Sequence, residues 1–242
     1  MEMIKFSNVV KTYNKGFLKK EVVALNKISL SVNKGEVFGF IGPNGAGKST
    51  AIKMLAGIIF PTSGSIEIAG VSVLNHKARS KLGFLPESPR FYDYLSAFEF
   101  MKLVASLLEV GDRELVSDSK IYEYLEMVGL KEVSQRIIRK FSLGMVQRLG
   151  IAQALLGNPE VLVLDEPLNS LDPFGRRDIM KILKELKESG KTIFLSSHII
   201  QDIERIATRI AIIKNGSIVI EGNIAEITKK TSLEEFFVHE TN

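Results

Sequence analysis

Apolar and polar residues alternate near the start of the chain, as they do in strands with one buried face. Partial alternation of this kind covers residues 4–10 and 24–32, and a period of two indicates a β-strand. A mostly apolar run at 37–41 and a further strand-like segment at 65–70 follow, with Lys34-Gly35 as a turn. The front of the chain therefore predicts several short strands.

The middle of the chain favours helices instead. Residues from about 96 to 156 look helical, and Ser96 with Glu99 forms the capping-box pattern that marks a helix start. Before this region, residues 82–86 predict a short strand that leads out of the core. We therefore expect a helical insertion between strands of the core.

Buried strands return in the last third of the chain. Residues 161–164 and 192–195 are continuous apolar runs, as strands buried on both faces require. A helix is predicted between them, over 173–189, and Asn215-Gly216 is a strong hairpin signal between two later apolar runs. We expect one or two short helices within 223–242. The order of elements predicts an α/β core with β structure in front and the helical insertion in the middle.

Composition and charge fit a cytosolic globular protein. The 242 residues include 32 basic and 28 acidic side chains, a net charge of +4, and no cysteine. This mild charge does not indicate nucleic acid binding, which calls for a clustered basic face, and the lack of cysteine excludes disulfides and thiolate metal sites. No apolar run is long enough to span a bilayer, and the N-terminus lacks a signal-peptide core. We therefore expect contact with a membrane only through a partner.

A phosphate-binding loop follows the strand at 37–41. Its sequence, Gly-Pro-Asn-Gly-Ala-Gly-Lys-Ser-Thr, matches the pattern G-x-x-x-x-G-K-[ST] in a strand–loop–helix setting. Glycines let backbone N–H groups wrap closely around a phosphate. Lys48 can reach the β- and γ-phosphates, and Ser49 can offer its hydroxyl to Mg²⁺. The residues predicted to contact the nucleotide are Gly42, Pro43, Asn44, Gly45, Ala46, Gly47, Lys48, Ser49 and Thr50.

A pair of carboxylates follows the apolar strand at 161–164. In a protein with a phosphate loop, Asp165 is placed to hold Mg²⁺ through its water shell, and Glu166 is placed to act as general base on the attacking water. Such a pair at a strand end is otherwise as often solvated loop charge. The phosphate loop favours the functional interpretation.

Five further segments stand in a characteristic order around these motifs. Residues 141–145 read Phe-Ser-Leu-Gly-Met, residues 169–172 Asn-Ser-Leu-Asp, residues 196–198 Ser-Ser-His and residues 83–87 Gly-Phe-Leu-Pro-Glu, while Tyr13 lies near the N-terminus. In this order they resemble the signature, D-loop, switch histidine, Q-loop and adenine-stacking aromatic of an ABC transporter ATP-binding subunit. The resemblance covers essentially the whole chain.

The resemblance implies a role for each of these residues. Tyr13 would stack on adenine, and His198 would reach the γ-phosphate and complete a catalytic set with Lys48 and Glu166. Ser142 and Gly144 would complete the ATP site of a facing subunit, and Asp172 would organise that dimer interface. Simpler interpretations stand beside these. Ser142 and Asp172 also suit ordinary helix N-caps, while tyrosines at strand ends and single histidines after strands are usually packing residues.

Two positions depart from the usual family pattern. The Q-loop holds Glu87 where most members hold glutamine, so a carboxylate rather than a neutral amide would help to ligate Mg²⁺. The signature keeps Ser142 and Gly144 but lacks its usual second glycine and its glutamine. Both variants resemble those of export-type members.

The family resemblance implies an α/β fold in which a P-loop NTPase core carries an N-terminal antiparallel β-subdomain and an inserted helical signature subdomain. Residues 1–242 would form this single ABC ATPase domain. Residues 1–86 and 157–222 would hold the β-subdomain and nucleotide-binding core, residues 87–156 the Q-loop and helical subdomain, and residues 223–242 a helical tail.

The function implied is ATP hydrolysis with Mg²⁺ that powers an export-type membrane transporter. Two chains, identical or different, would clamp two ATP molecules head to tail on the cytoplasmic face of the membrane. The partners implied are a membrane-spanning permease subunit and a second ATPase subunit, without nucleic acid.

A soluble ABC ATPase of iron–sulfur assembly, translation or DNA repair is the alternative function. The chain has no long coiled-coil insertion and no second cassette, which counts against it, although size alone does not exclude an iron–sulfur assembly ATPase. A kinase or other P-loop transferase would leave the signature, D-loop and switch histidine unexplained.

Overall fold

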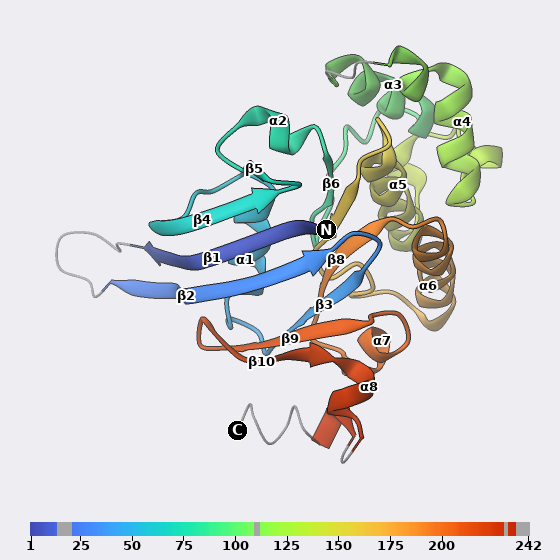
Figure 1. The fold of residues 1–242 in the computed structure, drawn as a ribbon. Helices are drawn as coiled ribbons and strands as arrows, with labels where there is room; N and C mark the ends of the chain where they lie inside the picture. Colours follow the sequence, from blue (N-terminus) through green and yellow to red (C-terminus); the bar gives the residue numbers. More distant parts are fainter. Residues whose placement is uncertain (14–20, 109–111, 230–231, 236–242) are drawn as a thin grey trace.

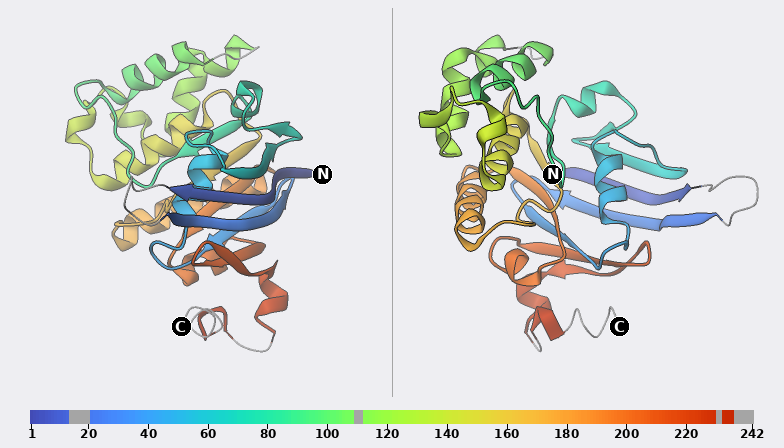
Figure 2. Two further views of the ribbon diagram at one scale, coloured as in Figure 1. Left: turned by 90° about the vertical axis from the view of Figure 1, so that its left-hand side faces the viewer. Right: turned by 180° about the vertical axis from the view of Figure 1, so that it is seen from behind.

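Two β-sheets form the centre of the molecule, with helices around them (Figure 1). The structure is a computed structural model that describes residues 1–13, 21–108, 112–229 and 232–235. Figure 2 shows from two further sides that a group of helices lies at one end of the molecule, while the C-terminal part lies at the other. The predicted α/β class, with β structure in front and a helical insertion, is confirmed.

The front sheet is antiparallel and has four strands. Its order is β2 (Val22–Asn33), β1 (Glu2–Tyr13), β4 (Ser63–Ile68) and β5 (Val71–Ser72). The first two are 12 residues each, longer than predicted. Their pairing shifts register between Phe6 and Val9, beside Asn8 at φ +48°. Because a bulge changes which residues face inward, the simple alternation breaks there and the sequence marked only part of each strand.

The central sheet has six strands, of which five are parallel. Its order is β10 (Ser217–Asn223), β9 (Arg209–Lys214), β3 (Val37–Ile41), β8 (Thr192–Ser197), β7 (Val161–Leu164) and β6 (Leu82–Leu85). The predicted hairpin is confirmed: β9 and β10 pair across Asn215 and Gly216, both at positive φ. The strand expected to lead out of the core is β6, at the edge of this sheet beside β7.

The predicted helical insertion consists of several shorter helices. The capping box at its start is confirmed, since Ser96 Oγ accepts from Glu99 N at 3.2 Å and Glu99 Oε2 accepts from Ser96 N at 2.8 Å. The α-helices of the chain are α1 (Lys48–Leu55), α2 (His76–Arg79), α3 (Ala97–Leu107), α4 (Asp118–Met127), α5 (Leu143–Leu155), α6 (Pro173–Glu188), α7 (Ile200–Glu204) and α8 (Ile224–Ile227). Short 3₁₀ turns lie at Arg113–Val116, Lys131–Val133 and Ile138–Lys140.

The predicted short helices of the tail are α8 and a helical turn at 233–235. The rest of that prediction, at 230–231 and 236–242, lies outside the described residues. No helix in the described part of the chain is long and apolar enough to cross a bilayer.

The central sheet separates two hydrophobic cores. Because successive side chains on a strand point to opposite faces, Phe38 and Phe40 of β3 join the core shared with α1 and the front sheet, while Val37 and Ile41 join the core shared with the helices. Phe38 stacks on Phe194 of β8 with ring centroids 5.7 Å apart. This packing fixes β3, and with it the loop that leaves its carboxyl end.

Candidate functional site

The phosphate-binding loop connects β3 to α1. At two of its positions, only glycine fits without a steric clash. Gly47 has φ +112°, and a Cβ there would lie 2.6 Å from the carbonyl oxygen of Ala24. A Cβ on Gly42 would lie 2.4 Å from the carbonyl oxygen of Ile213. The loop is therefore held between β2 and β9, with the N-terminus of α1 at its end.

Lys48 folds its side chain back over the loop. Its ammonium group is buried and donates to the carbonyl oxygen of Gly42 at 2.7 Å. It also lies 3.3 Å from Glu166 Oε1, in an ion pair whose side chains are both 6% exposed. A buried charge needs such a partner because desolvation alone would be costly. The geometry places one positive charge against the backbone of the loop.

Asp165 directly follows the carboxyl end of β7. There it lies beside Ser196 of β8 and Ser49 at the start of α1. Its Oδ1 accepts from Ser196 Oγ at 2.7 Å, and Ser49 Oγ lies 3.5 Å away. Burial raises the pKa of the Asp165 carboxyl, while the two serine hydroxyls act in the opposite direction. Asp165 and Ser49, which the sequence linked to one metal ion, thus lie side by side.

Glu166 is held between Lys48 and His198. Its Oε2 lies 2.9 Å from His198 Nδ1 and accepts from His198 backbone N at 3.3 Å. Its own N–H donates to Ser196 Oγ at 2.9 Å. Its backbone has φ +49°, a left-handed conformation that costs a non-glycine residue about 1 kcal/mol or more. The contacts around Glu166 maintain that strain and aim its carboxylate between the two partners.

A cavity of about 540 Å³, here called the loop cavity, opens over this cluster. Eight of the residues that line it were predicted from the sequence: Asn44, Gly45, Gly47, Lys48, Ser49, Thr50, Glu87 and Glu166. Five others were missed: Val22, Val23, Ala24, Asn215 and Gly216. Three residues of the loop do not line the cavity: Gly42, Pro43 and Ala46. Asp165 and His198 do not line it either, but they contact the lining residues Ser49 and Glu166.

The missed residues come to the loop through tertiary contacts. Gly216 donates its N–H to the carbonyl oxygen of Ala46 at 2.9 Å, and accepts from Asn26 N at 2.8 Å. The hairpin turn is thereby tied to both the loop and β2. Val22 and Val23 are 39% and 49% exposed although apolar. This exposure is visible only in the structure, so the sequence carried no signal that pointed to these two valines.

Tyr13 lies at the end of β1 and does not line the loop cavity. Its side chain is 40% exposed, and Lys11 Nζ lies 5.2 Å from its ring centroid. It pairs with Val22, which does line the cavity. The following residues, 14–20, are not described, and the adenine-stacking role of Tyr13 stays a prediction.

Glu87 reaches the loop cavity from the segment after β6. It is exposed, and its Oε1 accepts from Asn169 Nδ2 at 3.3 Å. Its charge adds a small upward contribution to the pKa of Asp165. The sequence predicted Glu87 at this site but not its contact with Asn169, since the two are 82 positions apart.

The oxygen donors fit Mg²⁺ as an ion held jointly with a phosphate. Mg²⁺ is usually bound through one or two protein oxygens, with water and substrate phosphate completing its shell. Ser49 Oγ and Asp165 Oδ1 offer such a pair, 3.5 Å apart. No cluster of three or more potential metal-ligating histidine or carboxylate side chains occurs among the described residues.

Ser142, Gly144 and Asp172 meet in a different cavity, of about 360 Å³, here called the signature cavity. Ser142 Oγ caps α5 by accepting from Met145 N at 3.3 Å, and Asp172 Oδ1 caps α6 by accepting from Gly175 N at 2.7 Å. The helix-cap interpretations are therefore confirmed. The signature cavity shares no lining residue with the loop cavity, so the predicted ATP contacts fall into two separate groups.

The loop and the two carboxylates thus meet at the carboxyl edge of the parallel strands, and known proteins resemble this chain in sequence and fold. The sequence model of the ABC transporter family matches residues 25–169. The uncharacterized ABC transporter ATP-binding protein sll0415 of Synechocystis is 41% identical over 90% of this chain. The chain spans 62% of that relative's length.

A second relative matches along nearly its whole length. The lantibiotic transport ATP-binding protein SrtF of Streptococcus pyogenes is 41% identical, over 97% of this chain and 96% of SrtF. Among solved structures, the dimeric ATP-binding cassette MJ0796 in its post-hydrolysis state with ADP and Pi has a TM-score of 0.80. It is 29% identical and covers 91% of this chain and 98% of MJ0796. The chain therefore belongs to the ABC transporter family and has the P-loop NTPase fold of that family's ATP-binding cassettes.

Proposed function

We propose that the loop cavity binds the phosphates of ATP. We further propose that Lys48, Glu166 and His198 promote the hydrolysis that releases the γ-phosphate. The observation that carries this proposal is the continuous contact from Lys48 through Glu166 to His198, beside the pair of Ser49 and Asp165. Phosphoryl transfer depends on positioning and on stabilising negative charge. This arrangement supplies a cation for the phosphates, a carboxylate for the water and oxygens for a metal ion.

Each residue then has a separate task. Lys48 exchanges its contact with the Gly42 carbonyl oxygen for phosphate oxygens. Glu166 accepts a proton from the attacking water, and His198 orients the Glu166 carboxylate through the bond at its Nδ1. Ser49 and Asp165 hold Mg²⁺, with Glu87 at the same end of the cavity; bound Mg²⁺ would neutralise charge on the phosphates.

The signature cavity supports a dimer as the working unit. Ser142 and Gly144 stand at the N-terminus of α5, which favours an anion, yet they line no part of the loop cavity of their own chain. Leu143 and Phe174 beside them are 53% and 70% exposed. We propose that a second ATPase subunit, identical or different, covers this face and places its own ATP against it, with Asp172 at the interface. The dimeric state of MJ0796 supports this arrangement.

We further propose that the dimer powers a membrane-spanning permease from the cytoplasmic side, in the direction of export. The transport function named for SrtF supports the permease, and the family variants at Glu87 and in the signature support the direction. In this proposal residues 1–86 and 157–222 form the β-subdomain and nucleotide core, 87–156 couple to the permease, and 223–242 form a tail.

The Glu166→Gln variant tests the catalytic part. Glutamine keeps the shape and accepts hydrogen bonds but takes up no proton, so we expect ATP binding to persist, hydrolysis to fall by about 100-fold or more, and ATP to trap a dimer. Light scattering with and without ATP measures the last effect. Lys48→Ala, which removes a phosphate contact, is the control that should not form the trapped dimer. Hydrolysis at the wild-type rate in Glu166→Gln would refute the assignment of that residue.

Co-purification tests the transport part. The tagged chain is recovered from native membranes in mild detergent and its partners are identified. A multi-spanning membrane protein in stable proportion supports the permease proposal. Soluble partners alone would leave the ATPase proposal intact and move the function to iron–sulfur assembly, translation or DNA repair.

A further inference from the structure

A further cavity lies away from the loop cavity, between α6 and α7. It has a volume of about 990 Å³. Its lining residues are Pro173, Arg176, Arg177, Asp178, Met180, Lys181, Lys184, Asp202 and Arg205, and they define what is called here the basic groove. None of them lines the loop cavity. Asp178 also lines the signature cavity, so the groove adjoins that cavity, while the other lining residues of the groove belong to neither proposed half-site.

The α6 residues of the groove form one continuous stripe. Positions three and four apart lie on the same side of a helix, and the spacing of Arg177, Lys181 and Lys184 follows that rule. Arg205, just after α7, adds a further cation on the opposite wall. Five of the chain's 32 basic side chains line this one groove, against two of its 28 acidic ones. This concentration of positive charge is unlike the near balance of the whole chain.

The acidic residues of the groove are already engaged, while several cations are not. Asp202 is buried and lies 3.5 Å from an Arg176 guanidinium nitrogen, and Asp178 lies 3.9 Å from Arg148 of α5. Lys181 lies 3.8 Å from Glu185 in an exposed pair, whereas Lys184 and Arg205 have no carboxylate within ion-pair distance in the described part of the chain. The groove therefore keeps a positive field that a partner can neutralise.

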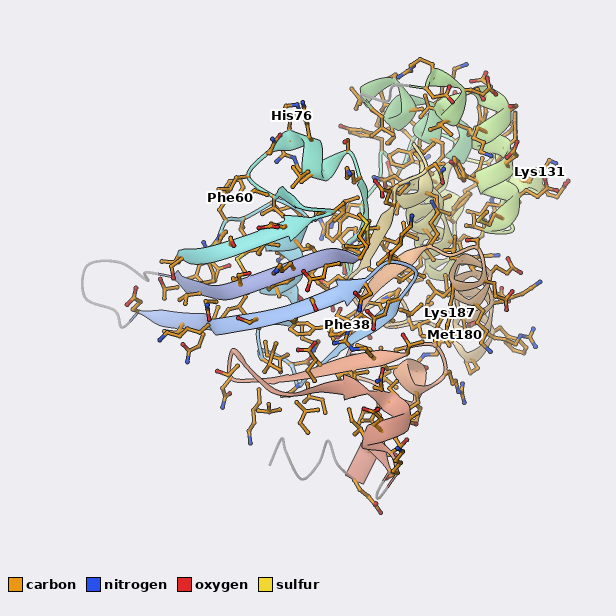
Figure 3. All side chains as sticks on the ribbon, in the orientation of Figure 1. Phe38, Phe60, His76, Lys131, Met180 and Lys187 are labelled. Carbon is orange, nitrogen blue, oxygen red and sulfur yellow. The ribbon has the colours of Figure 1, made fainter. Side chains whose placement is uncertain are left out.

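The floor of the groove is apolar. Met180 is only 8% exposed and lies between Arg177 and Lys184 along the stripe, and Pro173 is the other apolar lining residue among those described. Figure 3 shows Met180 on α6, with charged side chains projecting along that helix. A methionine surface adapts to varied apolar groups. The groove thus combines an apolar floor with cationic walls.

We propose that the basic groove is a docking site for an acidic peptide segment of a partner protein, with an apolar side chain seated between its carboxylates. Charge complementarity sets the sign of the partner. The concave shape and apolar floor suit a peptide chain more than a flat membrane surface. Nucleic acid is disfavoured because aspartates stand among the cations and, of the residues that the structure describes, no aromatic one lines the groove for base stacking. The groove shares Asp178 with the signature cavity, but the proposed peptide contact requires no ATP and is tested without it.

A binding titration tests this directly. The probe is a fluorescein-labelled peptide of glutamates interrupted by leucines, and its anisotropy is followed as purified chain is added. The test variant is the double substitution Lys181→Glu with Lys184→Glu. The matched control is Lys53→Glu with Lys77→Glu, which changes net charge equally at exposed positions of α1 and α2. Lys77 adjoins His76, which lies across the molecule from Met180 (Figure 3).

We expect the groove variant to weaken binding about tenfold or more, by removing two attractions and adding two repulsions, and the control to bind within about twofold of wild type. Binding should weaken as salt is added, and an all-glutamate peptide should bind more weakly than the leucine-containing one. If the groove variant and the control weakened peptide binding equally, the effect would come from net charge alone, and the proposal would be overturned. So would absence of peptide binding at low salt, or binding of anionic lipid vesicles through Lys181 and Lys184 without peptide binding.

Discussion

A single buried carboxylate, Asp165, opposes folding at neutral pH. Burial raises its pKa above the ordinary value of 3.8. The folded carboxyl therefore holds its proton more tightly than the unfolded one, so stability falls as pH rises through the window above 3.8 and recovers as pH falls through it. The Asp165→Asn variant removes this penalty while an amide oxygen can still accept from Ser196. We expect a higher melting temperature than wild type at neutral pH.

The difference in melting temperature between Asp165→Asn and wild type should shrink as the pH is lowered into the acid range, because wild-type Asp165 then takes up a proton. Thermal unfolding of both proteins across pH, without nucleotide or Mg²⁺, measures it. A difference that does not change with pH would contradict the assignment to Asp165.

Asn169 positions Glu87 over the loop cavity, through the 3.3 Å hydrogen bond from its Nδ2. In Asn169→Ala the Glu87 carboxylate loses this restraint. We expect the Mg²⁺ concentration for half-maximal ATPase rate to rise a few-fold, the scale of one typical hydrogen bond, about 1 kcal/mol, with less change in the maximal rate. In a Glu87→Ala background the Asn169→Ala substitution should have no further effect. A further loss there would mean that Asn169 acts elsewhere.

Most residues of the candidate site could be predicted because they stand in local sequence motifs. The others reach the loop only through strand pairing, so the sequence did not reveal them. The loop, Asp165 and Glu166 stand in continuous segments whose chemistry is legible residue by residue. Val22 and Val23 became lining residues only because β2 passes the loop, and Gly216 only because its turn bonds to Ala46. Contacts of that kind depend on which strands pair and in what register, which one sequence does not specify.

At the scale of elements, the approach of β6 to α5 depends on a glycine. A Cβ on Gly83 would lie 1.8 Å from the carbonyl oxygen of Ala154 and 2.9 Å from a Leu162 methyl group. In Gly83→Ala either α5 or β6 must move, so we expect a loss of about 2 kcal/mol or more in the free energy of unfolding. Urea unfolding measures it.

The matched control is Gly222→Ala in β10. There the nearest atom to a new Cβ would be Ile227 Cδ1 at 3.5 Å, an ordinary contact. We expect a change within about 0.5 kcal/mol for this control. Equal stabilities of the two variants would show that β6 and α5 separate freely.

Strand lengths in the front sheet show the limit of periodicity. The alternation predicted only residues 4–10 and 24–32 of two strands that run for 12 residues each. Asn8 and Lys27 both have positive φ, close to the points where the register shifts. A bulge inverts the inward and outward positions after it, so the pattern fades although the pairing continues. The buried runs of β7 and β8 have no such interruption and were located from the sequence alone.

At the scale of the whole molecule, the two cavities share no lining residue, and in the proposed dimer each would supply half of an ATP site. The loop cavity has the charges for phosphates, and the signature cavity has a capped helix N-terminus and exposed apolar neighbours. A two-fold dimer presents the same surface from both chains. In the proposed head-to-tail arrangement, each complete site therefore combines Lys48 of one chain with Ser142 of the other.

Mixing two inactive variants tests that combination. Lys48→Ala disables the loop half-site and keeps the signature, whereas Ser142→Arg fills the signature cavity and keeps the loop. We expect each variant alone to be inactive. An equal mixture should recover about a quarter of the wild-type ATPase rate, because half of the dimers are mixed and each mixed dimer has one intact site of two.

The mixture distinguishes a shared site from a self-contained one. If ATP bound between the loop cavity and the signature cavity of the same chain, every chain in the mixture would have one disabled cavity. No activity would then return. A mixture of Lys48→Ala with Glu166→Gln is the control, because both substitutions fall in the loop half-site and a mixed dimer has no intact combination. Recovery in the first mixture and none in the control requires that the two cavities of different chains face each other across one ATP.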